Sequence, residues 1–180
     1  MSKKKEKPSG RELSRLVRAW DDVAEQPELA SKVMEHAIKK YPAFAPGWGH
    51  LGLAYMQCGR AKDAEGALLE AASLEPESAG WHLALSTLYK LAVANAKGLT
   101  ERVEHARRLV EAGLTLSPDL LNPPPDYVKQ ITLIALNCSY EYAHQMSEQH
   151  AKQVLNLTQD KEFTYPAINN LIEVQMADGI

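Results

Sequence analysis

The sequence predicts an all-α fold, an α-solenoid built from antiparallel helix pairs. Apolar residues recur at spacings of three, four and seven positions, which is typical of amphipathic helices. Prolines follow these helical segments at Pro42, Pro76 and Pro118, at intervals of 34 and 42 residues. Repetition at such a period indicates helical hairpins that bury their apolar faces against one another.

The clearest unit spans residues 45–78. Its apolar spacing predicts two helices, with a break at Gly59 and a stop at Pro76. Small residues stand where the two helices must approach closely, and large apolar residues fill the space between them. The residues expected to pack this unit are Trp48, Leu51, Gly52, Tyr55, Ala64, Leu68, Ala71 and Pro76.

This order of residues resembles the tetratricopeptide repeat (TPR), whose 34-residue unit carries Trp-x2-Leu-Gly-x2-Tyr, later alanines and a closing proline. The resemblance covers residues 11–118 and is specific in 45–78. It implies about three repeats wound into a right-handed superhelix. The inner surface of such a superhelix is lined mainly by the first helix of each repeat.

The flanking units depart from this pattern. Residues 11–44 form a degenerate first repeat, and 79–120 form a third that is eight residues longer. The extra residues lie near 93–101, where Gly98 and Thr100 predict either a loop capped by Thr100 or extra turns on the first helix.

Both ends of the chain are expected to be atypical. Residues 1–10 predict a disordered basic N-terminus, and 121–160 predict a divergent helical hairpin whose two helices are Tyr127 to about Cys138 and a segment around Tyr142 to Leu155. In residues 161–180 we expect a capping helix, Pro166 to about Met176, followed by a tail.

Composition and charge narrow the class of protein. Residues 1–10 carry a net charge of +3 and the remainder −6, which disfavours nucleic acid as a partner. No apolar run reaches the roughly 18 residues that span a bilayer, and no secretory signal is recognised. Cys58 and Cys138 lie far apart in sequence, which favours a reducing, cytoplasmic setting without disulfides.

Motifs for chemistry are missing from the sequence. The six histidines form no His-Glu-x-x-His set, and no phosphate-binding loop or nucleophile elbow occurs. His50 and His82, on first helices of neighbouring repeats, could approach each other, but no carboxylate or thiol completes a metal site. We therefore expect no catalytic residue, no metal and no cofactor, and a protein that is not an enzyme.

The resemblance to TPR proteins implies that ligand contacts come from the second, fifth, ninth and twelfth positions of each repeat. In the degenerate first repeat these are Glu12, Arg15, Ala19 and Asp22; Pro46 and Gly80 hold the second position in the next two. The residues expected to bind a partner on the inner face are Gly49, Leu53, Met56, Leu83, Thr87 and Lys90.

This face is small and apolar, and it lacks the fixed donors with which some family members clamp the carboxylates of a chaperone tail. It suits an amphipathic helix or an extended apolar segment. Three occupants stay open: a protein partner, the chain's own C-terminal helices, or a second copy in a homo-oligomer.

The sequence accordingly predicts a non-catalytic adaptor or scaffold that binds a protein or peptide partner. A small secretion or assembly chaperone and a recruiting subunit of an enzyme complex are the alternatives. Neither the partner nor the pathway is encoded in a recognisable motif.

Overall fold

The computed structural model describes residues 7–111, 136 and 140–177, and its regular elements are all α-helices. The prediction of an all-α fold is confirmed for these residues. The helices are α1 (Gly10–Asp21), α2 (Pro27–Lys40), α3 (Ala45–Gln57), α4 (Ala61–Leu74), α5 (Ala79–Glu111), α9 (Tyr140–Leu157) and α10 (Lys161–Ala177).

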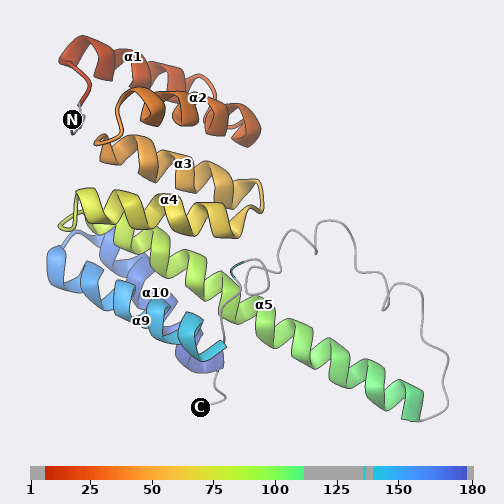
Figure 1. The fold of residues 1–180 in the computed structure, drawn as a ribbon. Helices are drawn as coiled ribbons and strands as arrows, with labels where there is room; N and C mark the ends of the chain where they lie inside the picture. Colours follow the sequence, from red (N-terminus) through yellow and green to blue (C-terminus); the bar gives the residue numbers. More distant parts are fainter. Residues whose placement is uncertain (1–6, 112–135, 137–139, 178–180) are drawn as a thin grey trace, which may run out of the picture.

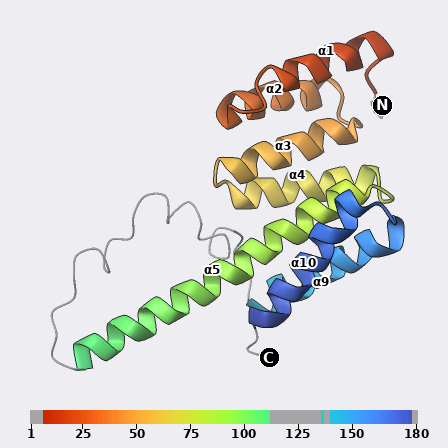
Figure 2. The same cartoon turned by 180° about the vertical axis from the view of Figure 1, so that it is seen from behind.

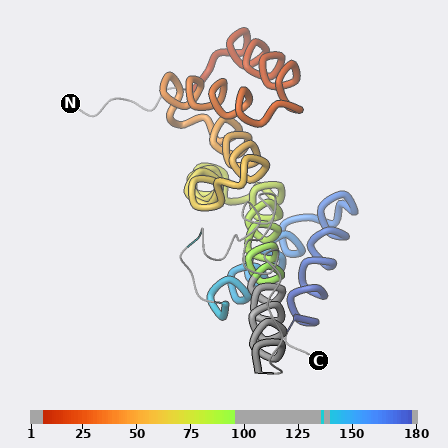
Figure 3. The backbone as a smooth tube through the Cα atoms, turned by 90° about the vertical axis from the view of Figure 1, so that its right-hand side faces the viewer, coloured from red at the N-terminus to blue at the C-terminus, as the bar shows by residue number. Residues whose placement is uncertain are grey.

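Neighbouring helices pack in chain order at the N-terminal end and out of order at the C-terminal end. From α1 to α5 each helix packs on the next (Figure 1). Helix α9 then pairs with α5, although 28 residues separate them in sequence, and α10 contacts both. The reverse view shows α9 and α10 together on α5, and the side view shows both running alongside it (Figures 2 and 3).

The turn between α3 and α4 forms as the sequence predicts. Gly59 has a φ of 72°, a left-handed conformation that glycine adopts without steric cost. Its N–H donates to the Met56 carbonyl, and the Arg60 N–H reaches back to the Tyr55 carbonyl at 2.9 Å. This pair of hydrogen bonds closes the end of α3 in a Schellman motif, so Gly59 ends the helix by its backbone conformation.

The core lies where α3, α4, α5 and α9 meet. Tyr89 is fully buried there, its hydroxyl donates to the Glu65 carboxylate of α4, and its ring lies edge-on to Tyr142 of α9. A Cβ on Gly52 would lie 2.6 Å from Leu68, so this glycine lets α3 and α4 approach closely. Of the expected packing residues, the buried ones are Leu51, Gly52, Tyr55, Ala64, Leu68 and Ala71.

Two expected packing residues lie at the edge of this core. Trp48 is half-buried, and its indole N–H donates to the Pro42 carbonyl at 3.0 Å. Pro76 follows the end of α4, and its carbonyl lies 2.9 Å from His82 Nε2. Both residues therefore connect a helix to the turn beside it.

Of the two alternatives predicted for residues 93–101, the loop capped by Thr100 is wrong, and the extra turns on the first helix are observed. Helix α5 continues without interruption from Ala79 to Glu111 and extends past the other described helices (Figure 1). Gly98 is the only helix-disfavouring glycine or proline in that segment, and one glycine costs a helix only about 1 kcal/mol. The predicted third repeat, residues 79–120, therefore has one continuous helix over 79–111 in place of a helix pair.

The C-terminal helices also differ from expectation in their partners. Helix α9 covers the segment expected to be helical around Tyr142, but it packs on α5. Its expected hairpin partner, Tyr127 to Cys138, lies outside the described residues except for buried Leu136. Disorder is expected for residues 1–10, of which residues 1–6 also lie outside the described residues. Gly10 already belongs to α1.

Helix α10 starts five residues before the expected Pro166 because Asp160 caps it. The Asp160 carboxylate accepts the Glu162 N–H at 3.0 Å, and the Asp160 N–H in turn donates to the Thr158 hydroxyl. Thr158 and Asp160 are residue types that favour the start of a helix, so the sequence contains a signal for this position. The predicted helix starts at Pro166 because proline is also favoured in the first turn of a helix.

We expect Asp160→Ala to destabilise the chain by about 1 kcal/mol, the usual cost of losing an N-cap. Asp160→Asn should keep most of this stability because its amide oxygen can accept the same hydrogen bond. Urea unfolding followed by circular dichroism measures the difference. Equal stability of the alanine and asparagine variants would contradict the capping role.

Candidate functional site

An apolar groove lies between α1 and α3, with a volume of about 330 Å³. Helix α1 contributes one wall, and Asp21 is the charged residue that lines it. The opposite wall comes from the beginning of α3 and the residue before it. The lining residues are Leu13, Leu16, Val17, Trp20, Asp21, Met34, Phe44, Pro46 and His50.

The groove stays open because α1 packs only loosely. This helix has an apolar stripe, yet none of its residues is fully buried, and Leu13 and Val17 are 39% and 49% exposed. A stripe of this kind normally faces a core. On α1 it faces the groove.

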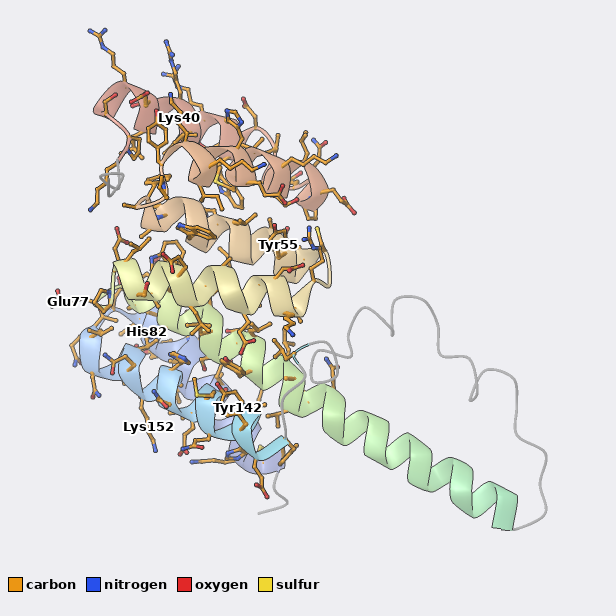
Figure 4. All side chains as sticks on the ribbon, viewed as in Figure 1. Lys40, Tyr55, Glu77, His82, Tyr142 and Lys152 are labelled. Carbon is orange, nitrogen blue, oxygen red and sulfur yellow. The ribbon has the colours of Figure 1, made fainter. Side chains whose placement is uncertain are left out.

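A polar contact holds α1 to α2. The Glu12 carboxylate accepts hydrogen bonds from the Tyr41 hydroxyl, from Lys40 Nζ at 2.9 Å, and from the Ser9 backbone and hydroxyl. Figure 4 labels Lys40 beside α1. These donors, Tyr41 first, hold the pKa of Glu12 well below its usual range. The carboxylate therefore stays charged and keeps this contact at any ordinary pH.

Aromatic rings form the floor that connects the groove to α5. The His50 imidazole stacks on Trp20 with centroids 4.4 Å apart, and it meets Trp81 of α5 edge-on at 5.9 Å. Burial lowers the pKa of His50, although the Asp21 carboxylate opposes this shift. The imidazole is therefore neutral near pH 7, and the floor of the groove carries no charge.

The residues of α3 that were expected to bind a partner lie beside this floor. The Trp81 ring lies against Gly49, so closely that a Cβ there would collide with it. Leu53 and Met56 are half-buried and pack against the core. Gly49 thus provides space for a side chain of the chain itself, and only Leu53 and Met56 keep some exposed surface.

The residues expected on α5 are covered by α10. Leu83 packs in a cluster with Phe163 and Leu171 of that helix. The Thr87 hydroxyl accepts a hydrogen bond from Asn170 Nδ2 at 3.1 Å. The chain's own C-terminal helix therefore occupies this part of the expected binding face.

Lys90 belongs to the same covered surface. Its Nζ lies 3.1 Å from the Glu173 carboxylate of α10, and its side chain is only 18% exposed. The six residues expected to bind a partner thus lie in two places: Gly49, Leu53 and Met56 beside the aromatic floor, and Leu83, Thr87 and Lys90 under α10. None of them lines the α1/α3 groove.

A buried polar network, which the sequence analysis missed, connects α5, α9 and α10. Asn170 Nδ2 donates to the Ser86 hydroxyl at 3.1 Å, and the Ser147 hydroxyl donates to the Ser86 carbonyl at 2.9 Å. All three residues are buried. A buried asparagine on an apolar helix face was the available signal, because such a residue needs a partner.

Two histidines make a separate polar contact between α5 and α9. The Nδ1 atoms of His82 and His150 lie 3.0 Å apart, and His82 Nε2 lies 2.9 Å from the Pro76 carbonyl. Figure 4 labels His82. A carbonyl can only accept, so His82 carries its proton on Nε2 and accepts at Nδ1. His150 then donates from Nδ1. The expected approach of His50 to His82 is wrong, because each imidazole has a different partner.

A second, more polar cavity of about 550 Å³ lies between α2, α3 and α4. Part of its charged rim is paired within the chain: the Tyr55 hydroxyl donates to Glu35 at 2.8 Å, and Arg60 pairs with Asp63 at 2.8 Å and covers the Tyr55 ring. The exposed Lys39 and Lys62 also line this cavity and add to its polarity. Burial, followed by the hydrogen bond to Glu35, raises the pKa of Tyr55 to about 12. These internal pairs leave the apolar α1/α3 groove as the better candidate site.

Within the described ranges, no cluster of three or more His, Cys, Asp or Glu side chains is arranged to hold a metal ion. The described helices include none that is long and apolar enough to cross a membrane. Comparison with protein-family models, with curated proteins and with solved structures finds no match.

Proposed function

We propose that this chain is a non-catalytic scaffold of TPR-like helical repeats that binds an apolar helical segment of a protein partner between α1 and α3. The observation that carries the proposal is the half-exposed apolar face of α1 along a preformed groove. The α5 residues that were expected to bind a partner, Leu83, Thr87 and Lys90, are covered by α10, so the groove at the N-terminal end is the accessible candidate.

The dimensions and charge of the groove favour a helix as the ligand. Helix α1 has 12 residues and is therefore about 18 Å long, which matches three turns of a partner helix. Such a helix presents apolar side chains at i, i+3 or i+4, and i+7. With neutral His50 in the floor and Asp21 at one end, the best ligand is apolar with a cation at the end that meets Asp21.

Selection from a library of helical peptides tests this proposal. The selected peptides should carry the three-position apolar pattern, and Val17→Glu should weaken their binding tenfold or more, about 1.4 kcal/mol, by placing a charge in the groove. Val17 is half-exposed, so the melting temperature should change little.

Leu69→Glu is the matched control. Leu69 is 41% exposed on α4 and does not line the groove, so this variant should bind the same peptides as the unmodified chain. Peptides that bind Val17→Glu as tightly as the control would place the site elsewhere.

A further inference from the structure

Helix α10 is apolar on two opposite faces. One face is buried against α5 and α9 through Ala167, Asn170 and Val174. At 100° per residue, a second set lies on the opposite side of the helix. This α10 stripe consists of Tyr165, Ile168, Ile172 and Met176, which are 56%, 40%, 48% and 62% exposed.

The stripe is unusual for the last helix of a stack. Terminal helices of repeat arrays normally present a polar outer face to water. Helix α9, in the same layer, follows this rule more closely, because its exposed face consists mainly of polar side chains and Tyr142 is the single exposed large hydrophobic residue among its described residues. The stripe instead exposes a few hundred Å² of apolar surface, as interaction sites do. A helix with two apolar faces belongs between two packed layers.

We propose that the α10 stripe is the interface of a two-fold homodimer, in which α10 of one copy packs antiparallel on α10 of the second copy. The charge of the surface fits this occupant. Thr164, Asn169 and Gln175 lie along the edges of the stripe, and the exposed Glu162 lies at the edge in the first turn of α10. Antiparallel packing places the two Glu162 side chains at opposite ends of the interface, so a two-fold axis brings no like charges together.

Lys161 supports the antiparallel orientation. It shares the face of the stripe and lies in the first turn of α10, where the positive end of its own helix disfavours a cation. In an antiparallel pair, Lys161 lies near the carbonyl end of α10 in the second copy, where a cation is favoured. The same orientation aligns the two stripes along their whole length.

The register follows from the spacing of the stripe. Its centre lies between Ile168 and Ile172, so Ile168 of each copy meets Ile172 of the other, and Tyr165 meets Met176. The stripe alone is smaller than the roughly 800 Å² per partner of a standard interface, so the dimer should dissociate on dilution.

Sedimentation equilibrium of the full chain at about 100 µM, a concentration that populates dimers of micromolar Kd, tests the proposal. The unmodified chain should be dimeric, and both Ile168→Lys and Ile172→Glu should be monomeric with unchanged circular dichroism. An equimolar mixture of the two variants should recover a dimer, because the positive charge introduced by Ile168→Lys then faces the negative charge introduced by Ile172→Glu.

Leu69→Glu is again the matched control, since it adds a charge at a similarly exposed leucine on α4 and should leave the dimer intact. The proposal is overturned if the unmodified chain is monomeric. This holds whether the stripe is then covered by undescribed residues of this chain or by another protein. Dimers that survive either isoleucine substitution, or a mixture that stays monomeric, would overturn it as well.

Discussion

Gly49→Ala should destabilise the chain by about 2 kcal/mol, within the usual cost of forcing extra atoms into a packed site. The added Cβ collides with three ring atoms of Trp81. That ring has little freedom to move, because its indole N–H is 3.3 Å from Glu75 and its edge meets His50. Alanine favours a helix more than glycine does, so a loss of stability in the Gly49→Ala variant must come from the collision with Trp81.

The same substitution at Gly66 is the matched control. No atom lies within 4 Å of a Cβ placed there, so Gly66→Ala should stabilise the chain by about 0.5–1 kcal/mol through helix propensity alone. Thermal and urea unfolding measure both variants. In a Trp81→Leu background, Gly49→Ala should lose its cost, and a cost that persists there would refute the contact with Trp81.

The folded chain should also lose about 2 kcal/mol of stability between pH 7 and pH 4 through His150 alone, a figure that allows for partial solvent screening. Burial, and then His82, lowers the pKa of His150 from 6.5 to about 4. Between these values the unfolded chain binds the proton and the folded chain does not. This contribution to stability is therefore complete above about pH 6.5 and declines as the pH falls towards 4.

The geometry explains why His150 resists protonation. Its Nδ1 already donates to His82 Nδ1, so an added proton would have to occupy Nε2. That atom is buried and has no hydrogen-bond partner in the described part of the chain.

His150→Gln should flatten the fall in stability from pH 7 to pH 4 by the same amount, because glutamine does not titrate. His36→Gln, at an exposed histidine of α2, is the control and should leave the pH dependence unchanged. Denaturant unfolding at several pH values measures the slope, and NMR titration reports the pKa of His150 directly. A pKa near 6.5 for His150 would contradict the expectation.

Local features of the fold could be predicted from the sequence. The break at Gly59 and the helix ends before Pro42 and Pro76 depend on backbone chemistry that a single residue encodes. For the segment near Gly98 the sequence left a loop and extra helical turns as alternatives, because a single glycine weakens a helix without having to end it.

The choice of partners could not be predicted, since an apolar helix face does not specify which other helix will cover it. Periodicity identified the face of α5 with Leu83, Thr87 and Lys90, but it contained nothing to say that α10 would pack there. The groove between α1 and α3 likewise depends on how loosely α1 packs, which is a property of the assembled helices.

The separation of α5 and α9 has a consequence for folding. Helices α3 and α4 are joined by three residues, whereas 28 residues lie between α5 and α9. Because the entropy cost of closing a loop rises with the number of residues between two packing partners, pairing α9 with α5 costs about 2 kcal/mol more than pairing α4 with α3. The N-terminal pairs thus have low contact order and can form early and independently, while the layer that carries α10 must wait for a distant segment of the chain.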